Sequence, residues 1–237
     1  MNVIDNLWKN DKGFLWMLGI SMLSLISTQI TIGILWESKF IVRLGFFLFT
    51  IIAIKSSSLP KGAKSIGYVI ASTLLLLAIV LIWSETQSLI LMYAILATGY
   101  MIYVITLVVN QIFTGGEITA HKVAGSVAVY ILLGQLWASL YLTCYIIYPP
   151  SFLYGGEIIK NDEALRQLSY FSFVTLTTIG YGDIVTLSPV ARLLTMVEGL
   201  LGQLFPAIFI AKLVSLQIGG RNKQDREPKK GIIEKSD

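Results

Sequence analysis

Two glycines at alternate positions, Gly180 and Gly182, stand out in the stretch TTIGYGD at residues 177–183. Glycine adopts the left-handed backbone conformation that residues with a Cβ resist, so alternate glycines allow successive carbonyls to point the same way. Stacked rings of carbonyl oxygens can replace the water around a monovalent cation such as K⁺. The sequence therefore predicts a passage for a dehydrated cation at residues 178–182.

The other residues of this stretch have predicted roles of their own. The Thr178 hydroxyl can add one more oxygen ring at the inner mouth of the passage. Ile179 and Tyr181 are expected to point away from the passage and to wedge the loop against its surroundings. Asp183 places negative charge at the outer mouth, where it attracts cations. Bound K⁺ is expected at four of these residues, Thr178, Ile179, Gly180 and Tyr181.

The composition indicates a membrane protein. Hydrophobic residues make up 55% of the 237 residues and charged residues only 14%, too apolar for a fold in water. The net charge of +4 is small, and the basic residues do not interleave with aromatic ones, so nucleic acid is not an expected partner. His121 is the sole histidine and Cys144 the sole cysteine, and no pair of carboxylates lies at membrane depth. We therefore expect no enzyme activity and no cofactor other than the permeant ion.

Six apolar runs are long enough, or nearly so, to cross a bilayer, which takes about 20 helical residues. The second run is the shortest, and it carries Arg43, whose side chain would have to reach the surface. Residues 55–64, rich in serine and lysine, are predicted to form a loop. The six runs cover approximately residues 14–36, 39–54, 66–83, 88–112, 121–148 and 189–218.

A seventh helix-like run, at about residues 164–177, is too short to cross. We expect it to enter the membrane and to return through residues 178–183. Such a re-entrant loop is tolerated only where protein or water covers its backbone. One copy of the loop cannot close a ring, so the chain is expected to form an oligomer. The predicted fold class is an all-α integral membrane protein with six transmembrane helices and a re-entrant pore helix.

The basic residues predict the orientation in the membrane. With the amino terminus inside, 13 of the 18 lysines and arginines lie on the inner side, which is the bias expected of cytoplasmic segments. Both termini are therefore expected in the cytoplasm. The same orientation places residues 178–183 at the outer face.

The stretch TIGYGD at residues 178–183 closely resembles the signature of the potassium channel superfamily, with Ile179 in place of the commoner valine. The resemblance covers about residues 121–218 as an outer helix, a pore helix, a selectivity filter and an inner helix. It implies a homotetramer in the cell membrane that conducts K⁺ passively. Two alternatives remain, a weakly selective cation channel and a non-conducting scaffold or transporter subunit.

The resemblance also divides the chain. Residues 1–113 resemble the four-helix sensor domain of six-helix channels, residues 114–218 form the pore domain, and residues 219–237 form a polar cytoplasmic tail. The fourth run, 88–112, contains no lysine or arginine, so the usual voltage sensor is not expected to work. Packing is the expected role of these helices, with a lipid or partner site and a degenerate sensor as alternatives. The short connection at 114–120 predicts that they pack beside the pore helices of their own chain.

The sixth run contains the gating candidates. Gly202 lies where the family often has a hinge glycine, and Pro206 has no N–H for the carbonyl of residue 202. An ordinary kink of a membrane helix is the alternative. Counting helical angles from Gln203 places Pro206, Ile210 and Val214 on the face toward the pore. Ile210 or Val214 could form an apolar constriction at the inner gate.

Three residues are expected to support the filter from behind. Glu198 is placed at membrane depth, where it is expected to bond the pore helix or to pair with Arg166 or Arg192; a neutral buried carboxylate is the alternative. In some relatives a carboxylate on the pore helix supports the residue at position 183. Val174 occupies that position here, so Tyr170 is the candidate to bond Asp183 instead.

Overall fold

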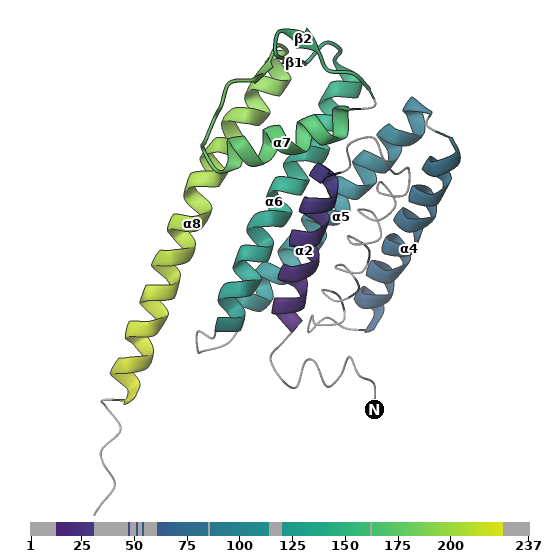
Figure 1. Ribbon diagram of the computed structural model, residues 1–237. Coiled ribbons are helices and arrows are strands. Elements are labelled where there is room, and N and C mark those ends of the chain that lie inside the picture. The colour runs from purple at the N-terminus through teal and green to yellow at the C-terminus, as the bar shows by residue number, and fades with distance from the viewer. Residues whose placement is uncertain are drawn as a thin grey trace, which may run out of the picture.

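The structure is a computed structural model that describes residues 13–30, 47, 51, 54, 61–84, 86–113, 120–161 and 163–224. Long helices run roughly side by side, and one short helix lies across them near one end (Figure 1). The helices are α2 (Gly13–Ile30), α4 (Lys61–Trp83), α5 (Gln87–Phe113), α6 (Ala120–Ile147), α7 (Ala164–Leu176) and α8 (Pro189–Gln224). The strands are β1 (Phe152–Tyr154), β2 (Glu157–Ile158) and β3 (Ile184–Thr186).

Four of the described helices, α4, α5, α6 and α8, are long and apolar enough to cross a membrane, and α2 has a shorter apolar stretch, Leu15–Ile26. The prediction of a helical fold with several membrane-capable helices is thereby confirmed. Six crossings stay a prediction, because the second apolar run and Arg43 fall almost entirely outside the described residues.

Two predicted boundaries were wrong. Residues 61–64, predicted as the end of a loop, form the first turn of α4, because the chain after Pro60 can begin a helix there. The last helix continues to Gln224 rather than ending near 218, so part of the predicted tail is helical. Its start agrees with the prediction, because Pro189 occupies the first helical position and the Ser188 hydroxyl accepts from the Ala191 N–H at 3.1 Å.

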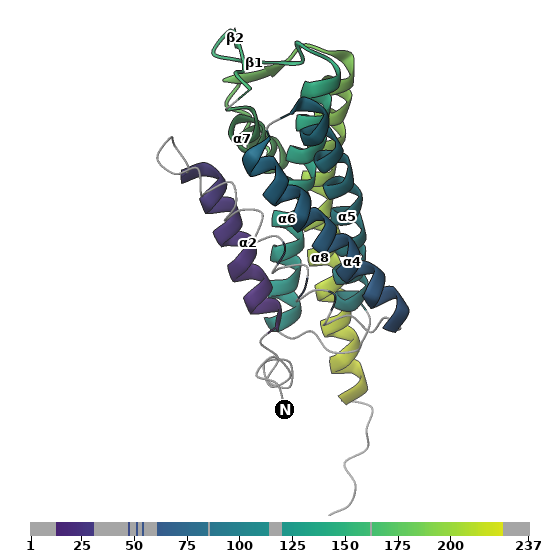
Figure 2. The same cartoon turned by 90° about the vertical axis from the view of Figure 1, so that its right-hand side faces the viewer.

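Helix α6 is the centre of the molecule. Helices α2 and α5 both pack against α6 of the same chain, and α4 packs on α5 (Figures 1 and 2). The Thr98 hydroxyl of α5 donates to the Ser139 hydroxyl of α6 at 2.9 Å. Gln135 of α6 donates through Nε2 to the Ser24 hydroxyl of α2 at 3.3 Å. Helices α2 and α5 therefore contact α6 directly within one chain. Packing beside the chain's own pore helices in an oligomer stays a prediction, because the structure holds a single chain and the connection at 114–119 lies outside the described residues.

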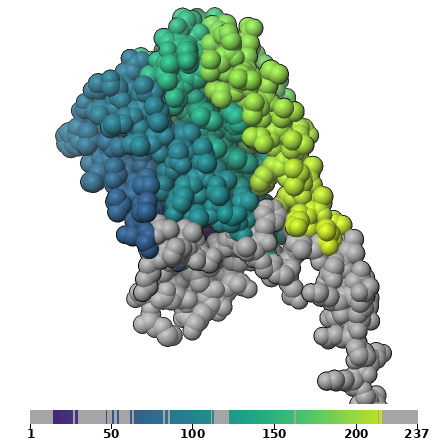
Figure 3. Space-filling model, turned by 180° about the vertical axis from the view of Figure 1, so that it is seen from behind, coloured from purple at the N-terminus to yellow at the C-terminus, as the bar shows by residue number. Residues whose placement is uncertain are grey.

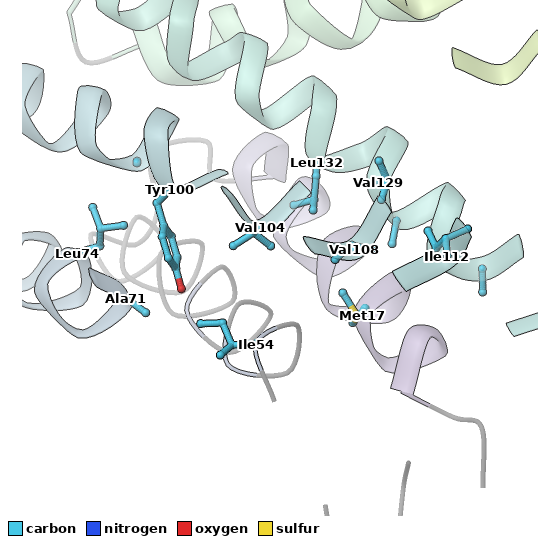
Figure 4. Close-up of a cluster of buried hydrophobic side chains, with 13 residues drawn as sticks. Met17, Ile54, Ala71, Leu74, Tyr100, Val104, Val108, Ile112, Val129 and Leu132 are labelled. Carbon is cyan, nitrogen blue, oxygen red and sulfur yellow. The ribbon is translucent and has the colours of Figure 1, made fainter. Parts of the chain in front are cut away.

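A buried apolar cluster joins these helices (Figure 4). Tyr100 extends from α5 toward α4, and its hydroxyl donates to the Gly67 carbonyl at 3.0 Å. No such hydrogen bond could be read from the apolar pattern of the two helices. The buried members of the cluster are Met17, Ile54, Ala71, Leu74, Ala97, Tyr100, Val104, Val108, Ile112, Ala124, Ala128, Val129 and Leu132.

A three-stranded sheet in the order β2-β1-β3 lies at the end of the molecule beside α7 (Figure 1). The β1–β2 hairpin turns at Gly155 and Gly156, whose φ angles of 56° and 89° are those of the two-residue turns that favour glycine. Strand β1 also pairs with β3, with Leu153 opposite Val185. The sequence analysis missed this sheet, because strands of two or three residues are too short to show periodicity.

Helix α8 contacts the rest of the chain mainly through its first half. That half lies beside α7 and β3, and the second half extends away from α6 (Figure 1). In the space-filling view α8 forms one margin of the molecule (Figure 3). Only 17% of the span Pro189–Lys212 is buried, against 61% of Lys122–Ile147 in α6. Most of the apolar surface of α8 is thus exposed in the single chain.

Candidate functional site

The backbone of residues 178–182 alternates between two conformations. Thr178, Gly180 and Gly182 have φ angles of 60°, 59° and 78°, in the left-handed region, and the two residues between them do not. The alternation predicted from the two glycines is therefore present, and it begins two residues before Gly180, at Thr178. A non-glycine residue in this region costs roughly 1–2 kcal/mol, so neighbouring contacts must hold Thr178 there.

The loop begins as the C-terminal cap of α7. The Thr178 N–H donates to the Thr175 carbonyl at 2.9 Å, and the Ile179 N–H donates to the Val174 carbonyl at 3.0 Å. These two bonds form a Schellman motif, in which the left-handed position is usually glycine. Thr178 takes that position here, so the helix end itself imposes the first positive φ of the loop. Val174 thus acts through its carbonyl oxygen, which also accepts from the Gly180 N–H at 3.3 Å.

The carbonyl oxygens of residues 178–182 have a different environment. Within the described part of the chain none of them accepts a hydrogen bond. The loop N–H groups of Thr178, Ile179 and Gly180 are used on the side of α7, so the oxygens are the groups left for other ligands. The side chains of Ile179 and Tyr181 are 55% and 68% exposed, so this chain alone does not supply the surface that was expected to hold them.

Asp183 is held at the end of the loop by three elements. Tyr170 of α7 donates to its Oδ2 at 2.9 Å, and the Ile184 N–H donates to Oδ1 at 3.1 Å. The Gly155 N–H of the outer hairpin donates to its carbonyl at 3.0 Å. Burial and the adjacent Asp183 carboxylate raise the pKa of the Tyr170 hydroxyl to about 12, so it stays a donor at neutral pH. The structure contains the Tyr170–Asp183 bond that the sequence suggested.

Tyr170→Phe is expected to loosen the outer end of the loop. The variant loses one hydrogen bond to a partly exposed carboxylate, which is worth about 1 kcal/mol. Amide hydrogen exchange of residues 183–186 should therefore become about fivefold faster. Tyr154→Phe is the control, because Tyr154 lies nearby on β1, is exposed, and makes no side-chain hydrogen bond in the described chain. Equal exchange rates in Tyr170→Phe and the unmodified protein would contradict the prediction.

Glu198 joins three helices behind the loop. It is fully buried in α8, accepts from the Tyr141 hydroxyl of α6, and lies 2.5 Å from the Ser172 hydroxyl of α7. Ser172 also lies 2.7 Å from the Gly134 carbonyl oxygen. The expectation of a bond to the pore helix agrees with these contacts. Tyr141, Ser172 and Gly134 could not be assigned from sequence, because the crossing of α6, α7 and α8 brings them together.

The alternative pairing of Glu198 with an arginine was wrong. Arg166 lies 3.5 Å from Glu163, and the Arg192 Nε donates to the Thr186 carbonyl at 3.4 Å. Both arginines lie at the end of the molecule near the sheet, whereas Glu198 lies deeper along α8. A hydroxyl pair satisfies the carboxyl group with less desolvation of charge than a buried ion pair would need.

Tyr141→Phe is expected to destabilise the folded protein. The substitution removes the Tyr141 donor to a fully buried Glu198, and a buried acceptor without its partner costs about 1–3 kcal/mol. The melting temperature in detergent should fall accordingly. Tyr68→Phe is the matched control, because Tyr68 is exposed on α4 and its loss should leave melting unchanged. Equal melting temperatures for the two variants would refute the role given to Tyr141.

Gly202 marks the closest approach of α8 to α7. A Cβ built at Gly202 would overlap the Leu176 carbonyl oxygen and lie 2.9 Å from the Leu176 carbonyl carbon. Helix α8 runs without interruption through Gly202 and Pro206, so the hinge remains a prediction. Ile210 and Val214, predicted to line the inner pore, are 59% and 50% exposed in the single chain.

The short helix α7 and the alternating loop at its end lie between two long apolar helices, α6 and α8. Residues 140–217 match a protein family described as ion channel. Over 81 residues the chain is 32% identical to the inward rectifier potassium channel Kirbac3.1 of Paramagnetospirillum magnetotacticum. This match covers 33% of the chain and 24% of that relative, so the chain matches only about a quarter of the relative's length.

No solved structure gives a significant match. The two sequence matches confirm that this segment resembles the potassium channel superfamily, as residues 178–183 predict. A channel family also points away from an enzyme.

Proposed function

We propose that four copies of the chain surround one axis and form a potassium-selective pore in the cell membrane. The observation that carries the proposal is the backbone of residues 178–182, which alternates in conformation and leaves its carbonyl oxygens without hydrogen bonds in the described chain. Four such loops around an axis supply the stacked oxygen rings that a dehydrated K⁺ needs. The similarity to a relative named as a potassium channel supports K⁺ as the permeant ion.

Further copies would cover the surfaces that one chain leaves open. Ile179 and Tyr181 are exposed beside the loop, and a row of apolar side chains is exposed along α8. Burial of such a row against a neighbouring α8 or α7 suits a ring of four subunits. The α8 side chains of this row are Leu193, Met196, Val197, Leu200, Leu201, Leu204 and Ile208.

The pore is not expected to respond to voltage through a charged fourth helix. Helix α5 contains no lysine or arginine between Gln87 and Phe113 and packs along α6. A charge moved across the membrane contributes about 2.3 kcal/mol per 100 mV, so a helix without charges gains almost nothing.

The proposed orientation, with both termini in the cytoplasm, follows from the distribution of basic residues.

Ion flux through the purified protein in liposomes tests the proposal. A K⁺ gradient should drive flux and an equal Na⁺ gradient should not. Equal flux of both ions would favour a weakly selective cation channel. If neither ion moves, Val214→Asp should open a closed inner constriction by wetting it; continued absence of flux would favour a scaffold or transporter subunit.

A further inference from the structure

Gln203 of α8 reaches the first residue of the loop. Its Nε2 atom donates a hydrogen bond to Thr178 Oγ1 at 3.1 Å, and both side chains are exposed in the single chain. Within the described residues this is the sole hydrogen bond of the Thr178 hydroxyl, and Gln203 makes no other with its side chain. The contact therefore links the inner mouth of the proposed passage directly to α8.

The position of Gln203 is fixed by its neighbours. The preceding residue, Gly202, lies against the Leu176 carbonyl with no room for a Cβ. The same carbonyl accepts from the Tyr130 hydroxyl at 2.9 Å, and the Tyr130 ring stacks on Phe205 at 5.8 Å between ring centroids. The backbone of α8 at this level cannot shift without breaking these contacts. The amide of Gln203 is thus presented to Thr178 by packed surroundings.

The hydrogen bond from Gln203 restricts the orientation of the Thr178 hydroxyl proton. A threonine oxygen has two lone pairs and one proton, and an unconstrained hydroxyl can rotate its proton toward any side. An amide donor occupies one lone pair and thereby limits where the proton can point. The second lone pair can then face a cation, whereas a proton facing the cation would repel it. The cap of α7 holds the Thr178 backbone but leaves its hydroxyl free to turn.

We propose that Gln203 is a positioning residue, which orients the Thr178 hydroxyl oxygen toward the conduction path and so presets the innermost oxygen ring for K⁺. The inference rests on the proposed function, because it requires an ion at Thr178. It also implies that a displacement of α8 at Gln203 would change the orientation of the Thr178 hydroxyl in that ring.

The test measures K⁺ binding by isothermal titration calorimetry to the purified, full-length protein in a buffer with a large organic cation. Gln203→Leu and Thr178→Val each remove one partner with little change of shape. Gln203→Leu is expected to weaken K⁺ binding about fivefold, the effect of one hydrogen bond, and Thr178→Val by at least as much, because it also removes the oxygen ligand itself. The double variant should be no weaker than Thr178→Val alone, because Gln203 acts only through that hydroxyl. Additive losses would overturn the proposal.

Gln203→Met is a second variant, which keeps the length of the side chain and removes its amide. It should weaken K⁺ binding as much as Gln203→Leu, because neither side chain can hydrogen-bond the Thr178 hydroxyl as the amide does. Binding as tight as in the unmodified protein would overturn the proposal. Melting of Gln203→Leu without K⁺ should be unchanged, and a large drop would show a structural role instead.

The two proposals can fail separately. K⁺-selective flux together with additive losses in the double variant would overturn only the role of Gln203. Equal flux of K⁺ and Na⁺ together with non-additive losses would overturn K⁺ selectivity and leave the positioning role in place. An unmodified protein that binds no K⁺ would overturn both.

Discussion

Gly202→Ala is expected to abolish the folded protein or to lower its stability by more than about 3 kcal/mol per chain. The added Cβ would overlap the Leu176 carbonyl, which belongs to the backbone and is already held by Tyr130. Neither the new Cβ nor the Leu176 carbonyl can move away by rotation of a side chain, so α8 must separate from α7. The gain of about 1 kcal/mol in helix propensity from glycine to alanine does not offset this loss.

Gly199→Ala is the matched control, because it makes the same change one turn earlier in α8, where a Cβ meets nothing within 4 Å. The yield of folded protein on gel filtration and its melting temperature should fall only for Gly202→Ala. A well-folded Gly202→Ala protein with altered opening would instead support the hinge interpretation. The close contact and the hinge therefore predict opposite results for the same variant.

Gly180→Ala is expected to abolish K⁺ flux while the protein still folds. Gly180 has a φ of 59°, and alanine there costs roughly 1–2 kcal/mol per chain. In the proposed tetramer, four strained copies would shift the carbonyl oxygens that we propose face the ion, and the rings need precise placement to replace its water. Flux in K⁺-loaded liposomes is the measurement.

Gly155→Ala controls for backbone strain alone. Gly155 has a φ of 56°, nearly that of Gly180, and a Cβ at either position meets nothing within 4 Å of its own chain. Its strain is therefore the same, but it falls in the outer hairpin rather than in the filter. Equal loss of flux in both variants would show that general destabilisation is responsible and would contradict the filter assignment.

The elements that local sequence patterns determine were predictable. Apolar runs of bilayer length predict α4, α5, α6 and α8, because the period and length of a membrane helix lie within one continuous segment. The two alternate glycines predict the left-handed positions of the loop for the same reason. The role of Thr178 as the cap of α7 was not predictable, because threonine rarely takes a position that favours glycine.

The contacts between helices could not be read from the sequence in the same way. Glu198 could be placed at membrane depth, but its partners Tyr141 and Ser172 lie on two other helices, 57 and 26 residues away. Its two candidate arginines had the right charge and the wrong position. The outer sheet was missed because its strands are stabilised by pairing between β1 and β3, which lie on opposite sides of α7 in the chain.

The sequence by itself predicted a helical membrane protein and the stretch that we propose contacts an ion, because the motif at residues 178–183 and the apolar runs are local features. Only the tertiary structure decided which side chains support that stretch. Gly202, predicted as a hinge, is also a point where α8 contacts the end of α7, and Gln203 beside it reaches Thr178. Such contacts depend on how helices cross, and the crossing is set by many weak packing interactions spread over the whole chain.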